Sequence, residues 1–208
     1  MTKTPAVTVA KRPLSALDAI YGRRSVRSYA PHMLAKSSVR ALLDAAVQAP
    51  TAMLVPPEVF VVVQDRQVMR QLSDRVKATW AQEAQPDPKL HIRRTAKLHG
   101  DFLEQLANPD FNAFHDAGTL ILICARRTDP SVVADCWLAA ENLMLAACAL
   151  RLGTCCIAAA VPALNAPDTR ILLGMPADVT AVVPIIVGVP AGGPAEVTRH
   201  EPEIISWK

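Results

Sequence analysis

The sequence has few glycines and none of the short motifs that assign many enzymes to a class. Its eight glycines form neither Gly-x-Gly-x-x-Gly nor a Walker loop, so nothing supports a dinucleotide-binding fold or a phosphate-binding loop. There is no His-Glu-x-x-His and no Gly-x-Ser-x-Gly, and the five histidines have no metal-ligand spacing beside the cysteines. The sequence therefore gives no support for a zinc protease, a nucleophile-elbow hydrolase or a metal site.

Cysteine pairs, net charge and leader-like segments are also scarce. The five cysteines include no Cys-x-x-Cys pair, and an odd number favours a reducing compartment over a disulfide framework. The adjacent Cys155 and Cys156 leave a redox pair open as an alternative to ordinary strand residues. The net charge of +3 is too small for the concentrated basic face of a nucleic-acid binder. Residues 1–13 lack the apolar stretch of a signal peptide, and we expect a cytoplasmic protein.

Hydrophobic residues, in contrast, are abundant, at 51% of the chain against 20% charged residues. We expect the surplus apolar surface to form a subunit interface. The longest apolar stretch, 132–152, approaches the length of a membrane span but contains Asp135 and Glu141, which are costly in lipid. Asp129 and Pro130 before it are typical of a helix N-terminus. We therefore predict a helix that is buried all round, as at the centre of a dimer, and no transmembrane segment.

The hydrophobic periodicity predicts helices that alternate with strands in one α+β domain over 1–208, an α/β sandwich without linkers. The second predicted strand is apolar on both faces and is expected at the centre of the sheet. Pro184 in the last strand indicates an edge position or a bulge. Ser37 and Asp65 are expected as helix N-caps. The predicted helices cover 15–21, 37–48, 66–80, 90–107, 130–152 and 165–174, and the predicted strands cover 59–64, 119–125, 153–160 and 181–189.

Residues 23–29, Arg-Arg-Ser-Val-Arg-Ser-Tyr, contain three guanidiniums and two hydroxyls within six residues. Arginine is a permanently charged, forked donor that suits a phosphate group, and serine adds neutral donors. A solvated arm has the same composition, and the cluster alone favours neither interpretation. Two further features, at 49–51 and 152–160, favour a site for a phosphate-bearing cofactor.

Four stretches of the chain together form a more specific pattern. They are 19–29; 45–60 around Ala49-Pro50-Thr51; 135–157 with Glu141-Asn142-Leu143 and Leu152-Gly153-Thr154-Cys155-Cys156-Ile157; and Leu172-Leu173-Gly174-Met175-Pro176, Val187-Gly188-Val189-Pro190 and Arg199. In this order the stretches resemble the nitroreductase family of FMN-dependent oxidoreductases.

The resemblance implies a nitroreductase-like fold, in which helices surround a central mixed sheet and the long buried helix lies at a homodimer interface with two FMN sites. Residues 23–27 and Arg199 would hold the FMN phosphate and ribityl chain. Residues 50–52 would approach the flavin from the other subunit, and 156–159 would lie along its ring. The cofactor contacts implied in this way are Arg23, Arg24, Ser25, Arg27, Pro50, Thr51, Ala52, Leu54, Cys156, Ile157, Ala158, Ala159 and Arg199.

The same resemblance implies a two-step alternating mechanism. NADH or NADPH would give a hydride to flavin N5, and an electron-poor acceptor such as a nitroaromatic or a quinone would then enter the same pocket. Because the flavin carries the hydride, no catalytic side chain is predicted. The expected partners are a second copy of the chain and a small-molecule acceptor, without nucleic acid or membrane.

The second stretch departs from the family pattern, since Leu54, Pro56 and Glu58 replace its Asn, Gln and Trp, and Val197 replaces a basic residue before Arg199. One lost amide hydrogen bond costs about 0.5–1.5 kcal/mol, too little to abolish a site with several charged contacts. The departures leave open a flavin-binding storage or sensing module, a reduced-flavin dehalogenase or a flavin-fragmenting enzyme. A basic-arm nucleic-acid binder is the least favoured alternative.

Two regions outside these stretches are expected to lie near the site. Residues 66–115 would form a helical excursion whose basic residues Arg93 and Arg94 are expected on a solvated face rather than at a nicotinamide phosphate. The tail, 190–208, ends in large apolar residues and is expected to dock on the partner subunit. The aromatic residues of the excursion, expected in the core or as a lid over the flavin, are Trp80, Phe102, Phe111 and Phe114.

Overall fold

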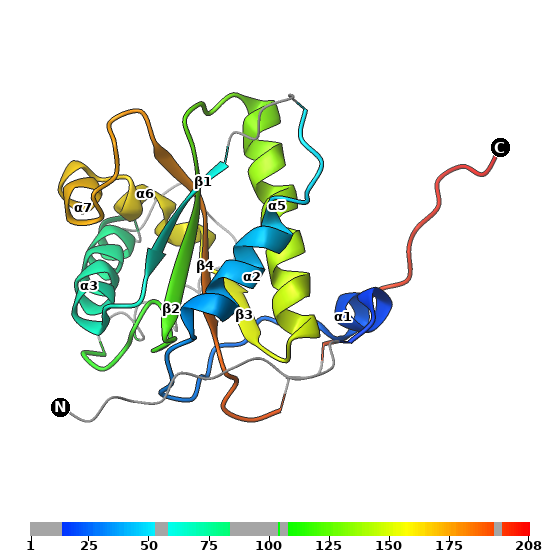
Figure 1. The fold of residues 1–208 in the computed structure, drawn as a ribbon, viewed down its shortest axis with the longest axis horizontal. Helices are drawn as coiled ribbons and strands as arrows, with labels where there is room; N and C mark the ends of the chain where they lie inside the picture. Colours follow the sequence, from blue (N-terminus) through cyan, green and yellow to red (C-terminus); the bar gives the residue numbers. More distant parts are fainter. Residues whose placement is uncertain (1–13, 53–57, 84–103, 105–107, 194–196) are drawn as a thin grey trace.

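The structure is a computed structural model that describes residues 14–52, 58–83, 104, 108–193 and 197–208. Four strands form one sheet, and helices cover both of its faces (Figure 1). Apart from residue 104, the predicted helix 90–107 lies outside the described residues, as do Leu54, Pro56 and Phe102. The principal elements are α1 (Ala16–Gly22), α2 (Lys36–Ala46), β1 (Glu58–Val63), α3 (Arg66–Glu83), β2 (Thr119–Ala125), α5 (Pro130–Ala149), β3 (Gly153–Cys156), a 3₁₀ turn (Ala158–Ala160), α6 (Val161–Leu164), α7 (Pro167–Leu172) and β4 (Thr180–Gly188).

The sheet has the strand order β1-β2-β4-β3, and all three strand pairs are antiparallel. The mixed sheet that the resemblance implied is therefore not found among the described strands. Their one parallel pairing is an isolated bridge from Ser25 to Thr154 at the open side of β3. The third strand is shorter than predicted because the chain enters the 3₁₀ turn after Ile157, whose N–H still donates to the Pro184 carbonyl at 2.9 Å.

β4 is an inner strand, so of the two alternatives predicted from Pro184, an edge position or a bulge, the structure shows the bulge. The register shifts where Ile123 pairs with Val183 and Cys124 pairs with Ala181. This irregularity lies next to Pro184, which has no backbone N–H to give to the ladder. An inner strand can therefore contain this proline.

β2 is buried from end to end because helices cover both faces of the sheet. Leu120 and Leu122 point into the core beneath α3 and α6, while Ile121 and Ile123 point into the core beneath α2 and α5. Successive strand side chains alternate between faces, which explains this division. Each such buried side chain stabilises the fold by about 1.5–3 kcal/mol relative to an exposed one. The central position predicted for this strand is confirmed.

α5 begins as predicted, with the Asp129 side chain accepting the Val132 N–H and Pro130 in the first turn. Among the described residues it is the one helix long and apolar enough to cross a membrane, with a mean hydropathy of 1.5. It packs against α2 and the sheet (Figure 1). In the single chain Trp137 and Leu138 of this helix are 42% and 46% exposed, so its burial on all sides at the centre of a dimer stays a prediction.

The ends of the other helices follow the sequence in part. Asp65 caps α3 as predicted, and its carboxylate accepts the N–H groups of Gln67 and Val68 at 2.8 and 2.9 Å. Ser37 does not cap α2, which begins one residue earlier at Lys36 without a side-chain cap. The predicted helix 165–174 is the shorter α7, and the four-residue α6 precedes it.

Candidate functional site

The arginine segment, residues 23–29, lies along the end of the sheet formed by β3 and β4. The Val26 N–H donates to the Thr154 carbonyl at 2.9 Å, and the Ala191 N–H donates to the Ser28 carbonyl at 3.0 Å. These backbone bonds give the segment an extended course beside ordered strands. The guanidiniums are thus presented from a fixed backbone rather than from a free arm.

Two glycines let the arginine segment lie close against the sheet. A Cβ at Gly153 would come within 2.8 Å of the Val26 side chain, and one at Gly188 within 2.8 Å of the Tyr29 ring. The Tyr29 hydroxyl donates to the Val26 carbonyl at 2.7 Å. Burial raises the pKa of Tyr29 far above its ordinary value, so this hydroxyl remains a donor at neutral pH.

A cavity of about 500 Å³, here called the cationic cavity, opens between the arginine segment, the C-terminal end of α5 and residues 190–193. It contains four of the predicted cofactor contacts, and the sequence analysis did not identify its fourth arginine, Arg151. Among the residues that the structure describes, no carboxylate lines this cavity. Its polar and charged side chains are those of Arg23, Arg24, Ser25, Arg27, Ser28, Arg151 and Thr154.

The arginines of this cavity differ in how far they are already engaged. Arg23 Nε lies 3.4 Å from a carboxylate oxygen of Glu141 on α5. Arg24 Nη1 donates to the carbonyls of Tyr21 and Arg23 at 2.7 and 2.8 Å, at the end of α1. Within the described part of the chain, neither Arg27 nor Arg151 has a side-chain hydrogen bond or ion pair. These last two guanidiniums are available for an anion.

A second cavity of about 620 Å³, here called the aromatic cavity, adjoins the first at Arg27. It is lined by Trp80 of α3, by Phe111 and His115 and by residues 155–159. The predicted ring contacts at 156–159 are thus brought together along one wall. The Trp80 indole Nε1 donates to the Ala159 carbonyl at 2.8 Å and fixes the 3₁₀ turn against α3.

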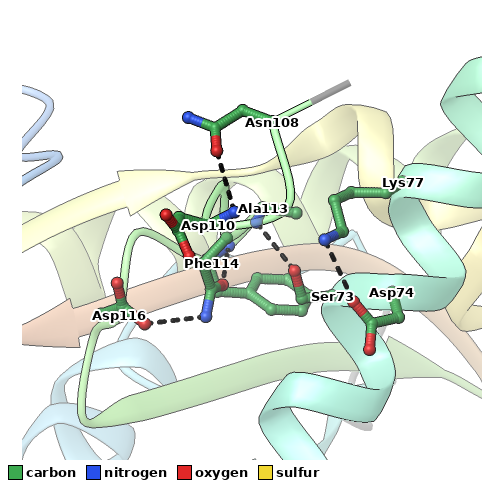
Figure 2. A network of polar contacts seen from close by, with 9 residues as sticks. Ser73, Asp74, Lys77, Asn108, Asp110, Ala113, Phe114 and Asp116 are labelled. Carbon is green, nitrogen blue, oxygen red and sulfur yellow. Dashed lines mark hydrogen bonds and ion pairs between the residues drawn. The ribbon is translucent and has the colours of Figure 1, made fainter. Parts of the chain in front are cut away.

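The loop 108–117 forms the other side of the aromatic cavity, and hydrogen bonds within the loop and to α3 hold it in place. The Ala113 N–H donates to the buried Ser73 hydroxyl at 2.9 Å, and the Asp110 N–H donates to the Asn108 side chain at 2.9 Å (Figure 2). Phe114 of this loop is fully buried in the core. The lid role considered for it is therefore wrong, whereas Trp80 and Phe111 do line the cavity.

His115 of the same loop was not identified from the sequence. It has a left-handed backbone, with φ 51°, and Asp116 follows with φ 53°. Its N–H donates to the Asn112 carbonyl at 2.9 Å, and its ring meets Phe111 edge-on at a centroid distance of 6.3 Å. No hydrogen-bond partner for its ring nitrogens is found among the described residues. The imidazole can therefore contact a ligand in the cavity.

Burial, and then the nearby Arg27 guanidinium, lower the pKa of His115 below 6.5, while Asp116 opposes the shift. The imidazole is therefore neutral at neutral pH and offers one N–H donor and one acceptor. Arg27 is the formal charge that the two cavities share. The site thus combines an anion-binding end with a flat, mostly apolar end.

The sequence model of the nitroreductase family matches residues 20–189. The chain belongs to the nitroreductase family. A protein of Archaeoglobus fulgidus named "Putative NADH dehydrogenase/NAD(P)H nitroreductase" is 26% identical over 182 residues, which is 84% of each chain. The structure of a Bacteroides fragilis nitroreductase with bound FMN has a TM-score of 0.73 at 23% identity and covers 94% of this chain and 98% of its own. A BluB-like flavoprotein from Clostridium difficile 630 has a TM-score of 0.74 at 18% identity, with coverage of 90% and 95%.

In this nitroreductase-family chain, the vicinal thiols contribute to the cavity wall. Burial raises the pKa of Cys156 to about 11, with Cys155 as a further cause, and burial also raises the pKa of Cys155. Both thiols are therefore protonated at neutral pH and are weak nucleophiles, which does not favour a redox pair. Among the described residues, no cluster of His, Cys, Asp or Glu could hold a metal ion.

Four predicted contacts of the nitroreductase pattern do not line either cavity of the single chain. Pro50, Thr51 and Ala52 follow α2, and the Ala52 N–H donates to both oxygens of the buried Asp135 at 3.2 and 3.1 Å. Arg199 lies in an extended tail that leads away from the sheet (Figure 1). The assignment of residues 50–52 to the partner's flavin and the assignment of Arg199 to the FMN phosphate therefore stay predictions.

Proposed function

We propose that this chain is an FMN-dependent oxidoreductase that takes a hydride from NADH or NADPH and passes it to an electron-poor acceptor, such as a nitroaromatic or a quinone. The observation that carries the proposal is the junction of the cationic and aromatic cavities at Arg27. FMN has a phosphate at one end and a flat ring system at the other, and the names of two similar structures include bound FMN. The guanidiniums and hydroxyls of the cationic cavity fit the phosphate end, and the mostly apolar lining of the aromatic cavity fits the ring end.

The residues present fit FMN in their chemistry as well as in their placement. Arg23, Arg27 and the Ser25 hydroxyl would hold the phosphate and the ribityl chain, since forked guanidiniums suit phosphate oxygens. The wall at 156–159 and the Trp80 indole would bound the ring system. When bound, FMN supplies the two-electron chemistry between the nicotinamide and the acceptor.

The chain's own contribution would be to position the reactants and shape the pocket. Trp80 holds the Ala159 carbonyl and so fixes the wall against which a planar molecule would lie. Phe111 and His115 present an aromatic edge and a neutral imidazole on the opposite loop. With the flavin ring against that wall, a nicotinamide and then a planar acceptor of similar shape would bind in turn beside the ring in the aromatic cavity. This order of binding gives an alternating mechanism.

We also infer a homodimer in which each FMN site includes residues of the partner. The α1–α5 side of the chain exposes large apolar groups, with Leu17 at 63% and Tyr21 at 75% exposure. The tail exposes Ile205 at 96% and Trp207 at 86%. Exposed apolar groups in this number favour burial against a second copy. Light scattering after gel filtration tests the dimer, and a monomer that binds FMN would overturn it.

The proposed activity is tested by the visible absorption spectrum of the purified protein, recorded anaerobically before and after adding NADH and then NADPH. A flavin band that bleaches, followed by steady turnover with a quinone, is expected for the oxidoreductase. A flavin band that does not bleach would instead favour a storage or sensing module. Absence of any flavin band after incubation with FMN would overturn the proposal.

A further inference from the structure

All three non-glycine residues with positive φ among the described residues, His115, Asp116 and Arg151, line the candidate site or a cavity beside it. A left-handed backbone is unfavourable for residues with a Cβ, and the residue that ends a helix in this conformation is usually glycine. Such conformations cluster where a side chain has a function. Arg151, with φ 59°, is the one that lines the cationic cavity.

The backbone around Arg151 is fixed by two hydrogen bonds at the end of α5. The Arg151 N–H donates to the Cys148 carbonyl at 2.9 Å, and the Leu152 N–H donates to the Ala147 carbonyl at 2.8 Å. The chain then turns directly into β3 at Gly153. This turn places the arginine side chain on the wall of the cationic cavity, far in sequence from the arginine segment.

The charges of the cavity leave Arg151 without a counter-charge from the protein. Arg23 lies beside Glu141, and Arg24 uses Nη1 on backbone carbonyls. Among the described residues, Arg27 and Arg151 have no such partner, and no carboxylate lines the cavity. Two uncommitted guanidiniums in one cavity match a doubly charged oxyanion, because each can give two parallel N–H groups to its oxygens.

We propose that Arg151 binds the phosphate monoester of the cofactor together with the arginine segment. This inference rests on the proposed function, since it takes FMN as the ligand. The alternative role for a cation here is stabilisation of the carbonyl end of α5. That alternative requires no ligand, so it predicts a change in stability but no selective change in affinity for a phosphate.

The test compares FMN with riboflavin, which has the same ring system but no phosphate. Apoprotein of the wild type and of Arg151→Gln is titrated with each flavin, and quenching of flavin fluorescence gives the dissociation constants. Loss of one charged hydrogen-bonding group predicts FMN affinity weaker by on the order of ten-fold, with riboflavin affinity unchanged. Arg40→Gln, which removes an exposed arginine of α2 outside both cavities, is the control for net charge.

A second variant, Arg151→Gly, removes the side chain while relieving the left-handed backbone. It is expected to fold at least as well as Arg151→Gln and to show the same selective loss of FMN affinity. Equal losses for FMN and riboflavin, or no loss for either, would overturn the role of Arg151. If wild-type apoprotein itself fails to bind FMN, the proposed function falls and this inference falls with it. A wild type that binds FMN beside an unaffected Arg151→Gln removes the inference alone.

Discussion

The cationic cavity and the aromatic cavity adjoin at Arg27, yet they are built in different ways. The largest contiguous part of the cationic cavity wall is the segment 22–28, held flat against β3 and β4. The aromatic cavity is assembled from α3, the loop 108–117 and residues 155–159, which are far apart in the sequence. The first can be recognised from local composition, whereas the second requires the folded chain.

The two cavities also differ in what they offer a ligand. The cationic cavity presents guanidiniums and hydroxyls, with their backbone fixed by pairing to the strands. The aromatic cavity presents flat apolar side chains with Arg27 as its formal charge and His115 as a neutral group. A change in one cavity should therefore affect phosphate recognition, and a change in the other should affect the ring and the acceptor.

The largest loss of FMN affinity is expected for Arg27→Gln, because this residue lines both cavities. Loss of a charged contact to phosphate is expected to weaken FMN binding by roughly 10- to 100-fold, and riboflavin binding should fall by less. Flavin titration of the apoprotein measures both affinities. An FMN affinity equal to that of the Arg40→Gln control would contradict the shared role of Arg27.

Gly188→Ala is expected to damage the cationic cavity indirectly. Its new Cβ would lie 2.8 Å from the Tyr29 ring and push the arginine segment away from β4. Overpacking of this kind typically costs about 1–3 kcal/mol of unfolding free energy. Urea unfolding measures this loss, with Gly193→Ala as the control because no atom lies within 4 Å of its added Cβ. Equal stability of the two variants would show that the close approach at Gly188 is unimportant.

Local patterns predicted the fold where burial and caps are encoded by adjacent residues. The buried β2, the Asp65 and Asp129 caps and the course of α5 all follow from such patterns. β3 ends early because the 3₁₀ turn packs against Trp80 of α3, a contact between distant segments. The periodicity of neighbouring residues does not predict contacts between segments that are distant in the sequence.

The residues of the candidate site also fall into those that local sequence predicted and those that it did not. The arginine segment was predicted because its donors are contiguous, and the structure groups them around one cavity. Arg151 was missed although a basic residue directly after a long apolar helix is a visible signal. His115 was missed for a different reason, since its meeting with Phe111 depends on two left-handed residues in a loop.

Trp80→Phe should affect the aromatic cavity while leaving the cationic one intact. The variant keeps a ring but loses the 2.8 Å hydrogen bond to the Ala159 carbonyl. A lost neutral hydrogen bond costs about 0.5–1.5 kcal/mol, and the loosened wall should lower kcat/KM for a quinone several-fold. The ratio of FMN to riboflavin affinity should not change. A change in that ratio would contradict the separation of the two cavities.

The smallest effect is expected for His115→Gln and concerns pH. Because the folded-state pKa of His115 lies below its ordinary 6.5, the unfolded chain takes up this proton first as the pH falls. The wild type therefore loses stability between about pH 7 and the lowered pKa, and His115→Gln should lose less over that interval. Urea unfolding at several pH values measures the difference. Parallel pH profiles would contradict a neutral, half-buried imidazole.

The central claim is that the two adjoining cavities form one site for a phosphate-bearing flavin. It is tested most directly by titrating wild-type apoprotein with FMN and with riboflavin under the same conditions. The arrangement of guanidiniums around the cationic cavity predicts FMN binding at least about 100-fold tighter than riboflavin binding. Equal affinities for the two flavins, or no binding of either, would contradict it.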